Sequence, residues 1–273
     1  WRGNDDHGAR TFPCVVKEGA FRLGLAGLPA GKERRLHLVL SPLHVNGAAE
    51  RVEIPLAYDG TSAPDVASLN GDLMVSWAEN AVMRGRDDAR NLVSDTAVAA
   101  APTPEAARKL RLLRSVLEPV APFDLGTVAG DSAILSDAKW TEATVGWGQV
   151  ARNHFWFDEH IQDGVFLSIK DRFYDKGLYA HSPARYAFPL DGKWKTFTAS
   201  IGLRDGANLQ GSAVFTVRGD GRELYRSRML RVGERDEVKV DIAGVKELEL
   251  VTAGGEGHNH NSWAIWAEPE VKR

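Results

Sequence analysis

Aromatic and imidazole side chains gather in a few short, turn-rich segments of the chain. Trp147 lies in the turn Gly146-Trp147-Gly148, and residues 153–160 combine three aromatic rings with two histidines. His181 follows a second turn, and residues 257–263 are polar and end in a tryptophan. Flat aromatic faces can cover the apolar C–H patches of a sugar ring, while imidazole and amide groups bond its hydroxyls. The side chains that could act in this way are Trp147, His154, Trp156, His181, Asn259, His260 and Trp263.

The histidines also raise the question of a metal site. His258 and His260 lie two residues apart, and His154 and His160 could join them. Zinc takes three or four ligands at set spacings, and this spacing matches no standard zinc motif. Calcium prefers oxygen ligands, and loop carbonyls could supply them together with carboxylates. The candidate carboxylates are Asp137, Asp158 and Glu268. The sequence alone does not assign metal ligands.

Motifs for covalent or phosphate chemistry are missing from the sequence. Cys14 is the only cysteine, so the chain has neither an internal disulfide nor a cysteine metal cluster. There is no Gly-x-Ser-x-Gly elbow, and the glycine-rich stretch 24–31 lacks the Gly-Lys-Ser/Thr of a phosphate loop. A glycosidase requires two carboxylates facing one cleft, and the spacing of the acids in the first half marks no such pair. These acids include Asp59, Asp65, Asp72 and Glu79.

Composition and charge restrict the class of partner. The net charge of −3 gives no electrostatic reason to expect binding to nucleic acid. No apolar run approaches the roughly 20 residues that span a bilayer, so we expect no membrane insertion. With 43% hydrophobic and 26% charged residues, the composition is typical of a globular protein. A chain of 273 residues can form one large domain or two ordinary ones.

The first 128 residues combine short strands with helices. Turn residues separate predicted strands at residues 20–26, 35–41 and 51–57. Helices are predicted near residues 65–90 and 103–118. Thr103 can cap the second helix, Pro104 suits its first position and Pro119 ends it. The region therefore predicts a small α+β domain, or a partial sandwich that the second half completes.

Residues 129–273 have only strand and turn patterns. Phe197, Ala199 and Ile201 alternate with polar residues, as in a strand with one buried face. Residues 212–218 and 222–228 flank Gly219-Asp220-Gly221, a strong hairpin signal. Regularly spaced strands without a helical pattern predict a β-sandwich or barrel. Three tryptophans are expected in its core, namely Trp140, Trp194 and Trp266.

Several motifs in this region follow one another in the order of a known family. Leu135-Ser136-Asp137 precedes Trp140 and the Gly146-Trp147-Gly148 turn, and a glycine-leucine-to-histidine turn follows at residues 174–182. The hairpin at residues 211–227, the strand at 241–250 and the run Asn259–Ala264 complete the series. Together they resemble the NPCBM family, also called carbohydrate-binding module family 51. The resemblance covers about half the chain, and residues 1–128 resemble no family that we recognise.

The resemblance implies a galactose-binding-like β-sandwich, or jelly roll, and a mainly β fold class. It also implies binding of galactose-type glycans, often a structural calcium, and a place in a larger exported bacterial protein that is secreted, periplasmic or held at the cell surface. The sequence departs from the family pattern in two places. Asn259 replaces an acid, and Tyr179 replaces a glycine.

We therefore expect a non-catalytic carbohydrate-binding module at residues 129–273. One alternative is a glycoside hydrolase or related hydrolase whose active site lies in residues 1–128. Another is an adhesive or structural sandwich that does not bind sugar. A carboxylate pair in a deep cleft would favour the hydrolase, whereas a buried, filled loop end would favour the structural role.

Overall fold

In the computed structural model the chain divides into two compact units, Trp1–Arg114 and Ser115–Arg273. The structure describes residues 2–5, 8–11, 14–17, 20–23, 34–40, 52–58, 66–161, 163–207, 210–255 and 258–273.

In the first unit, short strands pair with their neighbours along the chain. β1 pairs with β2, β3 with β4, and β5 with β6, each antiparallel. The strands are β1 Arg2–Asp5, β2 Gly8–Thr11, β3 Cys14–Lys17, β4 Ala20–Leu23, β5 Arg34–Leu40 and β6 Val52–Tyr58. The helices that follow are α1 Val66–Met83, α2 Ala89–Leu92, α3 Asp95–Ala99 and α4 Pro104–Leu117.

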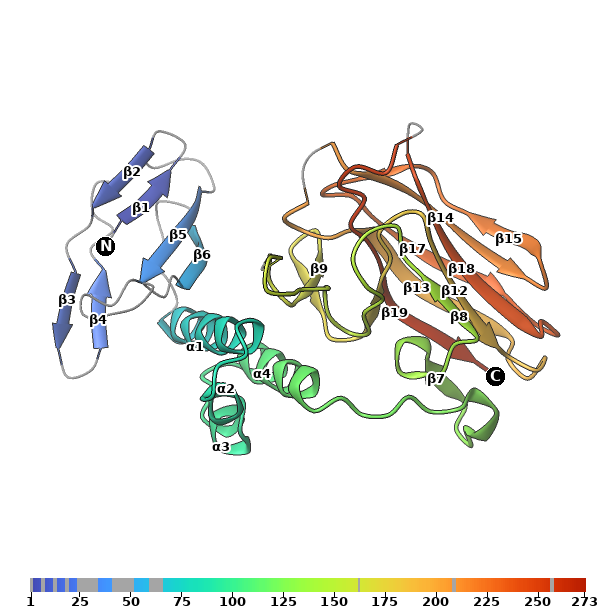
Figure 1. Cartoon of the computed structure of the whole chain (residues 1–273), viewed down its shortest axis with the longest axis horizontal. Coiled ribbons are helices and arrows are strands. Elements are labelled where there is room, and N and C mark those ends of the chain that lie inside the picture. Colours follow the sequence, from blue (N-terminus) through green and yellow to red (C-terminus); the bar gives the residue numbers. More distant parts are fainter. Residues whose placement is uncertain are drawn as a thin grey trace. The chain divides into compact units, whose positions relative to one another are not determined.

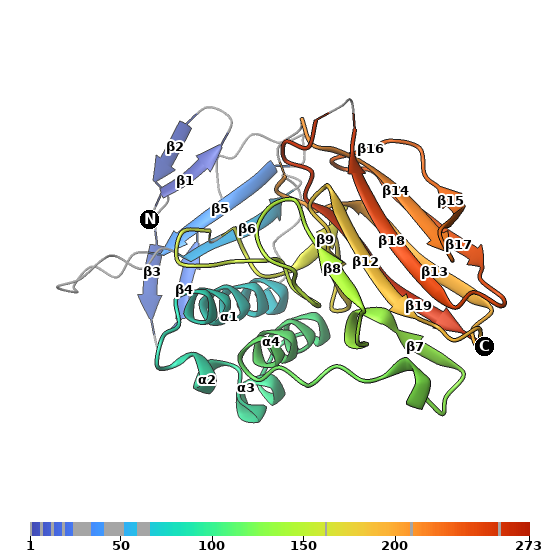
Figure 2. The same ribbon diagram turned by 45° about the vertical axis from the view of Figure 1, so that its right-hand side comes forward.

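Helix α4 begins as its sequence predicts. The hydroxyl of Thr103 accepts a hydrogen bond from the backbone N–H of Ala106 at 3.1 Å, and Pro104 is the first helical residue. The buried residues of the helix are Ala106, Leu110, Leu112 and Leu113. A Cβ built on Gly71 would lie 3.1 Å from the Cβ of Ala106, so α1 and α4 pack closely there, as Figure 2 shows. Among the described residues no helix has the length and apolar content to span a bilayer.

The second unit consists of two antiparallel sheets packed face to face (Figure 1). One sheet has the order β11-β19-β13-β17, with β7 paired to β19, and the other has the order β15-β14-β18-β12-β8, with β16 paired to β14. β9 and β10 form a separate hairpin. The strands are β7 Ser132–Ile134, β8 Glu142–Thr144, β9 Leu167–Ile169, β10 Arg172–Tyr174, β11 Gly177–Tyr179, β12 Ala184–Pro189, β13 Thr196–Leu203, β14 Ser212–Gly219, β15 Arg222–Arg226, β16 Leu230–Arg231, β17 Arg235–Asp241, β18 Glu247–Gly254 and β19 Ala264–Lys272. Two 3-10 turns, η1 Leu125–Thr127 and η2 Leu135–Asp137, precede and follow β7. The predicted mainly β sandwich is therefore confirmed.

The alternating patterns place one face of each strand in the core. Phe197, Ala199 and Ile201 of β13 are buried, as the period of two predicted. The hairpin predicted around residue 220 joins β14 to β15. Its two turn residues, Asp220 and Gly221, have φ angles of 50° and 79°, which a two-residue turn of this kind requires.

Trp266 lies at the centre of the core between the two sheets. Its side chain is fully buried, and its ring meets Phe215 of the opposite sheet edge-on, with centroids 5.1 Å apart. The indole Nε1 donates to the hydroxyl of Thr252 at 3.1 Å. Trp194 is also buried, and Trp140 is partly buried against the same core. The three tryptophans predicted to pack in the core do so.

The hydrogen bond between Trp266 and Thr252 gives a stability prediction. Thr252→Val keeps the side-chain shape but leaves the buried indole N–H without an acceptor. Such a loss costs about 1–3 kcal/mol, so we expect the free energy of unfolding to fall by that amount. Chemical denaturation measures it, and Thr198→Val on the partly exposed face of β13 is the matched control. Equal effects of the two substitutions would show that the hydrogen bond contributes nothing particular.

Candidate functional site

Aromatic rings gather around Trp147 at one end of the sandwich. The Trp147 ring meets the Trp156 ring edge-on, with centroids 4.9 Å apart and planes at 88°. The Trp263 ring lies nearly parallel to that of Trp147 at 6.1 Å, and the His181 ring lies 5.6 Å from it. The three indoles are partly exposed, whereas His181 is 6% exposed. These four residues are called the Trp147 cluster.

Strand ends bring the members of the cluster together. His181 follows β11, Trp263 precedes β19, and Trp147 follows β8. Because β11 and β19 run antiparallel, the end of one lies beside the start of the other. Backbone hydrogen bonds extend this pairing past the strands, from Ala180 N to the Ala264 carbonyl at 2.9 Å and from Ser182 N to the Ser262 carbonyl at 3.3 Å.

The two glycines beside Trp147 are required by close contacts. A side chain at Gly146 would collide with the backbone of Ser182, and the Gly146 N–H donates to the carbonyl of His181 at 2.9 Å. Gly148 has a φ of 77°, and a side chain there would run into the Trp156 ring. The Gly-Trp-Gly turn can therefore pass between the Trp156 ring and the chain after His181.

The Tyr179 side chain forms a hydrogen bond with the turn that carries Trp147. Its hydroxyl donates to the carbonyl of Trp147 at 3.0 Å, and its own carbonyl accepts a hydrogen bond from the hydroxyl of Tyr186. Burial raises the pKa of the Tyr179 phenol, so the group stays protonated and remains a donor. Tyr179 thus fixes the turn that carries Trp147.

The His181 imidazole is a fixed, neutral hydrogen-bonding group. Its Nδ1 lies 2.9 Å from the carbonyl oxygen of Ser182. Because a carbonyl only accepts, Nδ1 carries the proton and the lone pair of a neutral ring is on Nε2. Burial lowers the pKa of His181, partly offset by this hydrogen bond. At neutral pH the ring is uncharged and Nε2 can accept a hydrogen bond.

Arg204 supports the cluster and was not predicted from the sequence. The side chain is 6% exposed, and its guanidinium carbon lies 4.1 Å from the centroid of Phe155 and 5.9 Å from that of Trp263. Its Nε donates to the carbonyl of Phe166 at 3.0 Å, and its Nη2 donates to that of Asp163 at 2.6 Å. A charged residue that follows a strand reads as exposed in a sequence, so only the three-dimensional contacts reveal its position.

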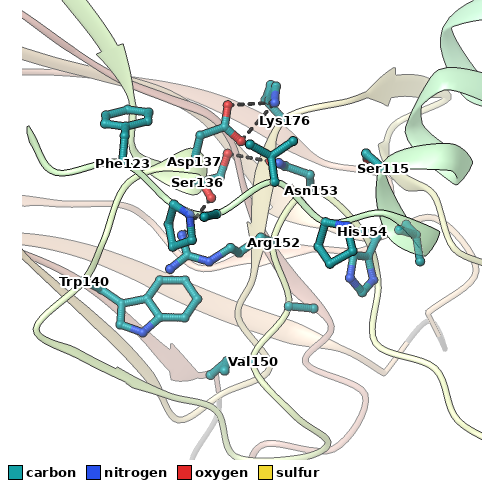
Figure 3. Close-up of a pocket in the computed structure, with 16 residues that line it drawn as sticks. Ser115, Phe123, Ser136, Asp137, Trp140, Val150, Arg152, Asn153, His154 and Lys176 are labelled. Carbon is teal, nitrogen blue, oxygen red and sulfur yellow. Dashed lines mark hydrogen bonds and ion pairs between the residues drawn. The ribbon is translucent and has the colours of Figure 1, made fainter. Parts of the chain in front are cut away.

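The remaining predicted residues lie outside these contacts. The His154 ring lies tilted by 59° against the Phe157 ring with centroids 5.9 Å apart, and His154 lines a cavity that none of the four cluster residues line (Figure 3). Asn259 and His260 are exposed in the loop that leads to Trp263, and the His260 ring lies 5.7 Å from that of His258. The structure therefore brings together Trp147, Trp156, His181 and Trp263, but places the other three apart from them.

The three acids considered for calcium have other partners. The Asp137 carboxylate accepts from Lys176 and Asn153, Asp158 accepts from two backbone N–H groups, and Glu268 pairs with Arg172 at 3.3 Å. Within the described part of the chain, no group of three or more His, Cys, Asp or Glu side chains is placed to hold a metal ion. A bound calcium stays a prediction.

Residues 131–272 match the model of the NPCBM/NEW2 domain. The chain belongs to the NPCBM/NEW2 domain family. The resemblance drawn from the sequence motifs is thus confirmed. The match contains the whole Trp147 cluster and begins after residue 130.

Relatives of this NPCBM/NEW2 chain include a protein of Renibacterium salmoninarum named "Putative endo-alpha-N-acetylgalactosaminidase". It is 31% identical over 156 residues, which cover 56% of this chain and 10% of the relative. The chain thus spans about a tenth of the length of that relative.

Similar solved structures come from two further bacteria. CBM51-2 with INT domains of Clostridium perfringens ZmpB, in complex with GlcNAc, is 24% identical with a TM-score of 0.46, over 52% of this chain and 31% of that chain. CBM51 of Clostridium perfringens GH95, in complex with methyl-galactose, is 23% identical with a TM-score of 0.46, over 52% and 99%. The tandem CBM51 modules of Streptococcus pneumoniae Sp3GH98 are 22% identical with a TM-score of 0.45, over 52% and 47%.

The imidazoles of His154, which is partly buried, and of His181, which is buried, give a pH prediction. Burial lowers the pKa of both, so below about pH 6.5 the unfolded chain binds protons that the folded chain does not. We expect their contribution to stability to be complete at about pH 7.5 and to be lost as the pH falls through the folded pKa values. The loss reaches up to about 1.4 kcal/mol per pH unit for each histidine.

Urea unfolding between about pH 7.5 and pH 5 measures this slope. The double variant His154→Gln, His181→Gln should flatten it relative to the native chain. His160→Gln, at a side chain that is 80% exposed, is the matched control. A double variant with the native slope would show that the two imidazoles are not the source.

Proposed function

We propose that the second unit is a non-catalytic carbohydrate-binding module and that the Trp147 cluster is its sugar site. The observation that carries the proposal is the gathering of partly exposed indoles beside a buried neutral imidazole. Among the described residues no carboxylate takes part in these ring contacts. The cluster therefore suits binding of an uncharged ligand better than acid–base hydrolysis.

The chemistry of the cluster matches a galactose-type pyranose. The axial O4 of galactose leaves C–H groups together on one face of the ring, and an exposed indole can cover that face. The Nε2 lone pair of His181 can accept a hydrogen bond from a hydroxyl at the edge of the sugar. Asn259 and His260, exposed in the loop before Trp263, would contact further sugar units outside the cluster.

The name of a relative also supports binding of a galactose-type sugar. The name of the Renibacterium relative concerns N-acetylgalactosamine, a galactose-type sugar, and describes a much longer protein. We propose that the module belongs to a larger exported protein of this kind and keeps that protein bound to its glycan. Weak binding is enough for this role, because attachment to a larger protein and to a repeating glycan raises retention.

Replacing the central indole tests the proposed site. Isothermal titration with methyl-galactose and N-acetylgalactosamine should give Kd values of about 1 mM to 1 µM. Trp147→Ala should weaken binding by roughly tenfold or more, since the indole supplies the stacking face. Leu224→Ala, at a residue 38% exposed on β15, is the matched surface control.

Two outcomes would count against the proposal. If the folded native chain binds no sugar on a glycan array, the unit has a structural or adhesive role instead. If Trp147→Ala binds as the native chain does, sugar binding occurs elsewhere in the chain.

A further inference from the structure

A cavity of about 520 Å³ opens in the second unit (Figure 3). None of the four cluster residues lines it. Its volume lies in the range of small-molecule sites in proteins. The polar side chains that line it are Ser115, Ser136, Asp137, Arg152, Asn153, His154 and Lys176.

The wall of this cavity includes chain outside the family domain. Seven of the sixteen lining residues lie between Ser115 and Phe123, and the family match begins at residue 131. The rim is apolar and open to solvent, since Val120 is 87% exposed and Val150 is 38% exposed. Exposed apolar groups around polar ones are typical of a ligand site. Part of the cavity wall is therefore supplied by residues that precede the family match.

Arg152 is the central charged group of the cavity. Its Nη1 donates to the carbonyls of Ser136 at 2.9 Å and Ala138 at 2.5 Å. Its guanidinium carbon lies 3.3 Å from the ring centroid of Trp140, which holds the group in one plane. Within the described part of the chain, no carboxylate forms an ion pair with Arg152, and its Nε and Nη2 have no hydrogen-bond acceptor.

The other charges of the cavity compensate one another. The Asp137 carboxylate accepts from Lys176 Nζ at 2.7 Å and from Asn153 Nδ2 at 2.7 Å. His154 donates from Nδ1 to the Phe155 carbonyl at 2.8 Å, and burial lowers its pKa, so the ring is neutral. With two cations against one carboxylate, the lining retains a positive charge, and Arg152 carries it.

Partial burial of this cation has an energetic cost. Burial lowers the pKa of the Arg152 guanidinium to about 10, although Tyr186 and Asp137 oppose the change. The group is still charged at neutral pH, and an anion in the cavity would offset the cost of its burial. The Nε–Nη2 edge of a guanidinium matches the two oxygens of one carboxylate.

We propose that this cavity binds a monosaccharide-sized ligand that carries a carboxylate, held by the Nε–Nη2 edge of Arg152. The chemical class is an acidic sugar of the uronic type. This site is distinct from the neutral-sugar site at the Trp147 cluster, and each can fail without the other.

Paired sugars that differ only in the carboxylate test the proposal. Isothermal titration compares galacturonate with galactose, and glucuronate with glucose, on the native chain and on Trp147→Ala. In Trp147→Ala, where the neutral-sugar site is removed, we expect each acid to bind at least about tenfold more tightly than its neutral partner, and more weakly as salt rises. Equal affinity for acid and neutral sugar in Trp147→Ala, or no binding of either acid, would overturn the proposal.

Variants separate recognition from folding. Arg152→Lys keeps a positive charge but loses the two-pronged edge, so acid binding should fall by about tenfold. Val120→Asp places a negative charge at the exposed rim and should weaken acid binding several-fold, whereas the matched Val120→Asn should leave it unchanged. If Arg152→Lys does not fold, the Val120 pair decides the question. Equal binding by Val120→Asp and Val120→Asn would contradict an anion site here.

Discussion

The Trp147 cluster depends on the pairing of β19 with β11 on one side and with β13 on the other. β19 begins directly after Trp263, β11 ends two residues before His181, and β13 ends directly before Arg204. The register of these three strands therefore fixes the side chains relative to one another. The backbone bond from Arg204 N to the Trp263 carbonyl, at 2.8 Å, continues the ladder to the base of the cluster. Because a slip by one residue would turn each strand's side chains to the opposite face, the buried core and the cluster specify the same register.

Much of the second unit could be predicted from its sequence. Period-two patterns such as Phe197, Ala199 and Ile201 have a direct physical cause, since successive side chains of a strand point to opposite faces. The Asp220-Gly221 turn was equally predictable, because few residues adopt positive φ angles easily. In the first unit, the capping of α4 by Thr103 is a local effect of the same kind. Each of these features is decided within about ten residues of chain.

The site was predictable only in part, because its composition depends on contacts between distant segments. The loop positions of Trp147, Trp156, His181 and Trp263 were visible as glycine-rich or polar surroundings. That His154 lines the cavity beside Arg152 and not the Trp147 cluster was not visible, since it lies only two residues from Trp156. The burial of Arg204 against Phe155 depends on a hydrogen bond to the carbonyl of Phe166, 38 residues away in sequence. No local sequence pattern predicts such a contact.

The Tyr179 hydroxyl on the Trp147 carbonyl has a consequence for how selective the cluster can be. The turn is held by the Tyr179 hydrogen bond and by close contacts at Gly146 and Gly148, so it has few alternative conformations. Little conformational entropy is therefore lost when a ligand binds. The same rigidity prevents the indole from tilting to follow a differently shaped molecule. The cluster thus behaves as a rigid template, whose preferences follow the fit of the ligand rather than the adaptability of the protein.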